Sequence, residues 1–168
     1  MALLVGFLHP ILTPSHALAL VGLGVLIGQQ TAYRRLLVQT VFASALAAAL
    51  VALAFAVGET PAGDVLLAGV VIAGALAAAA IRPPLMILGP LAAAIGAAIG
   101  LDSPPEVISY QEAVIMLIGT GLGASLALAL VAECAARVAR DWQLIGLRVL
   151  GSWTAASALL AIAVRFAK

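Results

Sequence analysis

Charged residues are scarce in this sequence. Arg and Lys number 8 and Asp and Glu 7 among 168 residues, so charged side chains make up 9% of the chain, whereas 65% of it is hydrophobic. The mean hydropathy is +1.24. A soluble domain of this size cannot bury so much apolar surface, and this predicts an integral membrane protein in contact with the lipid bilayer. A net charge of +1 gives no support for a nucleic acid partner.

Cysteine is nearly absent. The one cysteine, Cys134, excludes an internal disulfide and has no second thiol with which to bind a metal, so we interpret it as a small buried residue. The sequence also lacks a glycine-rich phosphate loop, a His-Glu-x-x-His zinc pair and a nucleophile elbow. Ser15 beside His16 cannot form a catalytic pair, because adjacent residues on a helix point about 100° apart. We expect no enzyme activity and no bound cofactor.

Histidine occurs only twice, and both copies lie in one stretch, GFLHPILTPSHALALVGLGVLIGQQ, at positions 9 and 16. Thr13 followed by Pro14 predicts a helix start, with the threonine hydroxyl accepting a free backbone N–H. His16 then falls in the first turn of that helix. Pro10 and Pro14 are expected to prevent one continuous helix around His9.

Two interpretations of this histidine pair stay open. Ionisable groups within membrane spans often mark a transport pathway, and neutral imidazole binds nickel, cobalt, copper or zinc. Two histidines are nevertheless fewer than the four ligands that a divalent metal ion usually takes. In the alternative interpretation, His9 and His16 only hydrogen-bond backbone groups that the prolines leave free.

We predict an all-α fold, a single integral membrane domain over residues 1–168, with about six transmembrane helices because each needs about 20 apolar residues. The start MALLVGFLHP lacks the charged region and cleavage site of a signal peptide, so we expect a processed form or a first span that inserts by itself. Three small-residue pairs indicate close helix packing, within the chain, in a homo-oligomer or against a larger membrane complex. The pairs are Gly24-xxx-Gly28, Gly96-xxx-Gly100 and Gly119-xxx-Gly123. The predicted spans lie near 14–30, 36–57, 61–81, 84–101, 104–131 and 142–165.

Arginines and acids alternate between the connections of these spans. The positive-inside rule makes the arginine-rich connections cytoplasmic, which places both termini and the histidine segment on the outer, periplasmic side of a bacterial inner membrane, in a multi-pass topology. Arg165 and Lys168 are exceptions to the rule. The arginines of the arginine-rich connections are Arg34, Arg35, Arg82, Arg137, Arg140 and Arg148; the acids of the other connections are Glu59, Asp64, Asp102, Glu106 and Glu112.

Three hydroxyl–proline pairs are predicted to begin helices on the outer side. Thr13-Pro14, Thr60-Pro61 and Ser103-Pro104 each precede an apolar segment, and the spacing of Ser103 and Glu106 is that of a capping box. Acids at such helix starts, Asp64 and Glu106 among them, stabilise the positive helix end. In the alternative interpretation, they form an outer vestibule that attracts cations.

The opening stretch resembles that of the HupE/UreJ proteins, whose signature is Gly-Phe-x-His-Pro-x-x-Gly-x-Asp-His-x-Leu-Ala-Met. Thr13 replaces the signature glycine and Ser15 the aspartate. A second signature, His-Gly-x-Ala-His-Gly-x-Glu, resembles Ile95–Asp102, with Ile95 and Ile99 at the two histidine positions. The residues that match the first signature are Gly6, Phe7, His9, Pro10, His16, Leu18 and Ala19.

This resemblance implies a secondary transporter, or permease, that carries divalent nickel or cobalt inward, with His9, His16 and Asp102 as the polar contacts of the metal. The two isoleucines favour an alternative: a transport-inactive accessory or structural subunit that packs its small-residue faces against a larger membrane complex. A third possibility, a channel for a small neutral solute, fits the uncharged helix interiors but has no motif.

Overall fold

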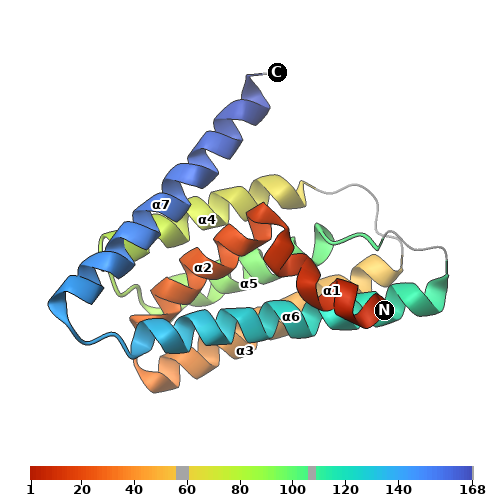
Figure 1. The fold of residues 1–168 in the computed structure, drawn as a ribbon, viewed down its shortest axis with the longest axis horizontal. Helices are drawn as coiled ribbons and strands as arrows, with labels where there is room; N and C mark the ends of the chain where they lie inside the picture. The colour runs from red at the N-terminus through yellow and green to blue at the C-terminus, as the bar shows by residue number, and fades with distance from the viewer. Residues whose placement is uncertain (56–60, 106–108, 168) are drawn as a thin grey trace.

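The computed structural model describes residues 1–55, 61–105 and 109–167, and within these ranges it contains seven α-helices and no strand (Figure 1). The predicted all-α class is therefore confirmed, and each of the six predicted segments contains a helix. One further helix precedes them. The helices are α1 (Ala2–Leu12), α2 (Pro14–Gly28), α3 (Ala32–Ala54), α4 (Ala62–Ala78), α5 (Leu85–Leu101), α6 (Tyr110–Ala136) and α7 (Asp141–Phe166).

The predicted count of six membrane spans is not confirmed. In the described part of the chain, α3, α6 and α7 are long and apolar enough to cross a membrane, and α1 with α2 would make a fourth span if the bent pair is counted as one. Helices α4 and α5 are apolar but have 17 residues each, which is the lower limit for crossing the hydrocarbon core. The fold is that of a membrane protein, and the number of spans stays a prediction.

The break between α1 and α2 lies at Thr13, after Pro10 and not at it. The expected break in the histidine segment is confirmed, but Pro10 is inside α1 and does not cause it. Thr13 has an extended backbone (φ −81°, ψ 114°), Pro14 takes the first helical position as predicted, and the two helices meet at a bend of 68°. The Thr13 hydroxyl makes no capping hydrogen bond, so this part of the helix-start prediction is wrong.

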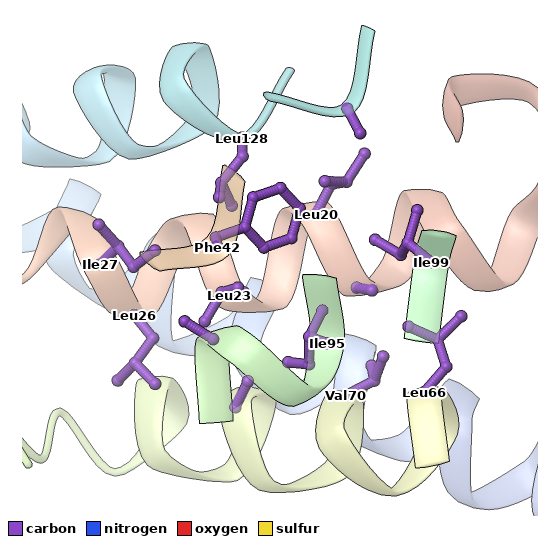
Figure 2. Packing of buried hydrophobic residues seen from close by; sticks show 14 of the residues in the cluster. Leu20, Leu23, Leu26, Ile27, Phe42, Leu66, Val70, Ile95, Ile99 and Leu128 are labelled. Carbon is purple, nitrogen blue, oxygen red and sulfur yellow. The ribbon is translucent and has the colours of Figure 1, made fainter. Parts of the chain in front are cut away.

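Helix α2 is the centre of the bundle. It contacts all six other helices, and ten of its 15 residues are buried. Figure 2 shows its side chains Leu20, Leu23 and Ile27 beside Phe42 of α3 and Leu128 of α6. A helix that is apolar on every side is typical of a position surrounded by other helices. Its first turn, which carries His16, is therefore positioned by the whole bundle.

All three predicted small-residue pairs are packing faces within the chain. A Cβ atom on Gly96 would lie 2.6 Å from the Phe42 carbonyl oxygen of α3, and one on Gly24 would lie 2.6 Å from Cγ1 of Val131 of α6. The remaining members have equally close neighbours: Gly28 contacts α6, Gly100 contacts α3, and Gly119 and Gly123 contact the backbone of α1. Small residues allow these backbones to approach closely in lipid.

The start of α6 differs from the prediction. The helix begins at Tyr110, and the cap is Ser109, whose hydroxyl oxygen accepts from the backbone N–H of Glu112 at 3.3 Å. Ser103 instead donates its hydroxyl to the Ile99 carbonyl oxygen at 2.6 Å, so it closes the end of α5. The proposed partner Glu106 lies outside the described residues, as do Thr60 and Glu59; α4 begins after Pro61.

Cys134 is exposed, which contradicts the expectation of a buried residue. It lines an apolar groove between α2, α6 and α7 together with Val131 and Leu147.

One residue has a backbone conformation that disfavours its side chain. Ala80, just after α4, has a φ of 54°, in the left-handed region where glycine has no steric penalty. We predict that Ala80→Gly raises the free energy of unfolding by about 1 kcal/mol, measured by SDS titration in mixed micelles. Ala79→Gly is the matched control, because Ala79 has a φ of −74° and should gain nothing. Equal effects of the two changes would contradict this explanation.

Two glycines of α5 provide a test of helix packing. We predict that Gly96→Leu destabilises the bundle by about 3 kcal/mol, because overpacking forces the backbones of α3 and α5 apart. Gly89→Leu is the control: a Cβ atom there meets nothing within 4 Å, so its unfolding midpoint should equal that of the wild type. The unfolding midpoint of the two variants is the measurement, and similar midpoints would argue against close packing at Gly96.

Candidate functional site

Charged residues lie mainly toward the two ends of the bundle, and one of these ends, which we call the acidic end, holds three carboxylates among the described residues. Asp64, Asp102 and Glu112 lie where α4 begins, where α5 ends and where α6 begins. Most of the described arginines lie toward the opposite end, where Glu133 near the end of α6 and Asp141 at the start of α7 also lie; Arg165, near the end of α7, is the exception. Its Nη1 pairs with Oδ1 of Asp64 at 2.6 Å, so this arginine is offset by a carboxylate at the acidic end.

The acidic end contains the three residues singled out from the sequence, and the structure brings them together. The rings of His9, on α1, and His16, on α2, have centroids 5.5 Å apart at an interplanar angle of 75°. Nε2 of His16 lies 3.2 Å from Oδ2 of Asp102, at the end of α5. His16 is fully buried, whereas the side chain of Asp102 is 36% exposed. One buried imidazole is thus joined to a carboxylate that reaches the surface.

Hydrogen bonding in the described part of the chain does not support the interpretation that both histidines only satisfy backbone groups. Nε2 of His9 and Nδ1 of His16 are buried and have no hydrogen-bond partner. Buried polar atoms are usually paired, so an unpaired nitrogen in each of two rings whose centroids are 5.5 Å apart needs an explanation. These three side chains do not form a closed metal centre by themselves, since no set of three His, Cys, Asp or Glu residues among the described ones is arranged to hold an ion.

The local sequence explains why this group forms. The break at Thr13 turns the chain by 68°, which allows His9 of one helix to face His16 in the first turn of the next. Asp102 follows the last residue of α5 and approaches the start of α2, where unpaired N–H groups and the helix dipole favour a negative charge. Ser15, which replaces the signature aspartate, leaves this helix start without its own carboxylate, and Asp102 supplies one from α5.

The second signature region has a different environment. Ile95 and Ile99, which occupy the two histidine positions, are both fully buried in the apolar core, and Ile95 packs against Gly69 of α4. Figure 2 shows both isoleucines within the group of core side chains. No metal ligand can come from these two positions.

The sequence interpretation missed polar groups at the opposite end of the bundle. Arg35 of α3 pairs with Glu133 of α6 at 3.2 Å and donates to the Gln30 carbonyl oxygen. Gln29 donates to the Ala77 carbonyl oxygen of α4, and its own Oε1, like Nε2 of Gln39, is buried with no partner in the described structure. Glutamines within or beside apolar segments were the signal that could have indicated this region.

Comparison with known proteins agrees with the resemblance in the sequence. A family model described as HupE / UreJ protein matches residues 1–161, nearly the whole chain. Neither the curated proteins nor the solved structures include a match. The matched family is of the accessory and transporter type, associated with nickel and cobalt, and is not a family of catalysts.

Proposed function

The chain belongs to the HupE/UreJ family, and on that premise we propose that it is a secondary transporter of a divalent transition metal ion, nickel or cobalt. The metal is the transported substrate. His9 and His16 provide its nitrogen ligands, and Asp102 assists them. One observation carries the proposal. His16 is fully buried and its Nε2 has a carboxylate partner, whereas its Nδ1 has no hydrogen-bond partner in the described structure.

Asp102 has a specific role in this proposal. A metal-binding histidine usually donates its other ring N–H to a carboxylate, which fixes the tautomer and the orientation of the ring. With the proton on Nε2, His16 donates to Oδ2 of Asp102 at 3.2 Å, and Nδ1 presents its lone pair. Asp102 then orients His16, and its exposed oxygen also attracts the cation from outside.

The small number of ligands supports a carrier more than a storage site. Transport requires binding that is favourable enough for entry and weak enough for release. Two imidazole nitrogens, with water or backbone oxygen completing the coordination, meet this requirement. Substrate sites of many transporters lie where a transmembrane helix is interrupted, and the bend at Thr13 is such an interruption.

The orientation in the membrane is part of the proposal. We place the arginine-rich helix ends in the cytoplasm and the acidic end, with both termini, in the periplasm, in an inner membrane that the six apolar segments cross. The positive-inside rule and the pairing of the exceptional Arg165 with Asp64 support this arrangement.

An accessory subunit remains the second candidate, but its expected docking faces are occupied. The three small-residue pairs that were to contact a larger complex pack against α6, α3 and α1 of the same chain. An accessory role would therefore need a different surface.

Nickel uptake tests the transport proposal. In proteoliposomes loaded with a nickel chelator, the wild-type protein should accumulate labelled Ni²⁺, and His16→Ala and His9→Ala should each reduce the initial rate to the background of protein-free vesicles. Ser15→Ala is the matched control beside His16, and its rate should equal that of the wild type. Absence of wild-type uptake, or uptake that ignores both histidines, would reject the carrier.

Two variants at residue 102 distinguish, in the same assay, whether Asp102 orients the ring of His16 or binds the metal directly. Asp102→Ala should weaken nickel affinity by about 10–100-fold. Asp102→Asn keeps an oxygen that accepts from His16 and should retain most of the affinity.

Topology can be tested in a Cys134→Ala background, which removes the one native thiol. Because the acidic end is placed outside, Glu112→Cys should react with a membrane-impermeant maleimide in intact spheroplasts. Arg137→Cys, near the other end of the same helix, should react only after permeabilisation. The reverse pattern would invert the proposed orientation, and labelling of both in intact spheroplasts would refute it.

A further inference from the structure

Pro10 creates a local problem in α1. Proline has no backbone N–H, so the carbonyl oxygen four residues earlier, that of Gly6, loses its partner within the helix. Gly6 and Pro10 are both buried, so water is not an easy substitute. A buried carbonyl oxygen without a partner is destabilising.

Thr120 of α6 supplies the missing donor. Its hydroxyl oxygen lies 3.2 Å from the Gly6 carbonyl oxygen and 3.1 Å from the Met116 carbonyl oxygen of its own helix. The single hydroxyl proton is therefore shared between an acceptor on α6 and an acceptor on α1. Thr120 is only 1% exposed, so this bond is protected from competing water.

Helix α1 is held by α6 more than by its neighbour in sequence. Figure 1 shows α1 lying along α6, and α1 makes many more contacts with α6 than with α2. A side chain on Gly6 would collide with the Met116 backbone, and side chains on Gly119 and Gly123 would collide with the backbone of α1. The position of α1, and of His9 three residues after Gly6, is therefore determined by its seat on α6.

We infer that Thr120 is a positioning residue for the metal site: its hydrogen bond to Gly6 fixes α1 on α6 and so holds His9 at the distance from His16 that binding needs. The inference rests on the proposed function, because it assigns to Thr120 a role in metal affinity. It adds a residue that lies outside both signature stretches.

Metal affinity of purified protein in nanodiscs tests this role, with Ni²⁺ as the probe and calorimetry as the measurement. Thr120→Val keeps the shape of the side chain and removes its hydroxyl, so it should weaken nickel binding about tenfold. Thr120→Ser restores the donor and should restore the affinity. Thr154→Val, at another buried threonine whose bond stays within its own helix, is the control and should bind as the wild type does.

A double-mutant cycle distinguishes positioning from general damage. If Thr120 acts through His9, Thr120→Val should have no further effect on the residual affinity of His9→Ala. An equal loss in both backgrounds would overturn the inference, as would an unchanged affinity in Thr120→Val.

A metal-free measurement keeps the inference separate from the transport proposal. Spin labels at Leu8 of α1 and Tyr33 of α3, both exposed, in the Cys134→Ala background should give one narrow distance in the wild type and Thr120→Ser, and a broader one in Thr120→Val. An unchanged distribution overturns the inference even if nickel binds. If the wild type binds no nickel, the proposed function fails, and a broadened distribution would still support the seating of α1 by Thr120.

Discussion

The contact between His16 and Asp102 is the constraint around which the rest of this bundle is built. A fully buried imidazole among leucines and isoleucines costs free energy unless its N–H groups find partners, and a carboxylate at 3.2 Å provides one. The two residues belong to α2 and α5, which otherwise make few contacts with one another. Their meeting depends on the packing of α3, α4 and α6 around them, so any change that shifts those helices also shifts the polar pair.

A helix break inside an apolar bundle needs protein to cover it. Backbone groups without partners are expensive in lipid and are tolerated only where protein or water surrounds them. Here α1 is seated on α6 through glycines and Thr120, and Asp102 contacts the ring of His16 in the first turn of α2. The same break brings His16 close to the Asp102 carboxylate, and imidazole and carboxylate are groups that can contact a cation or its water ligands.

The sequence predicted which polar side chains come together better than it predicted the helices that hold them. His9 and His16 could be expected to meet, because two prolines and a threonine separate them by a turn of chain. Asp102 could be anticipated only through the family signature, since 86 residues separate it from His16. Helix α1 lies before the first predicted segment, and it continues past Pro10 because a proline near the end of a helix removes only one internal hydrogen bond. Ser103-Pro104 has the sequence pattern of a helix start, but the Ser103 hydroxyl donates to the Ile99 carbonyl oxygen of the preceding helix. A hydroxyl residue before a proline can therefore lie at either end of a helix, and the pair alone does not predict which.

The side chains between His16 and the arginine-rich end of the bundle also distinguish a channel from a carrier. Ala19, Leu20, Leu23, Leu26 and Ile27 continue along α2 toward the arginine-rich end, and each is at most 2% exposed. A channel for a neutral solute would need a continuous path past these side chains, whereas close packing of this kind has no room for one. An ion bound at the histidines could reach the other end only if helices move apart. The packing therefore favours a carrier that changes conformation over an open pore.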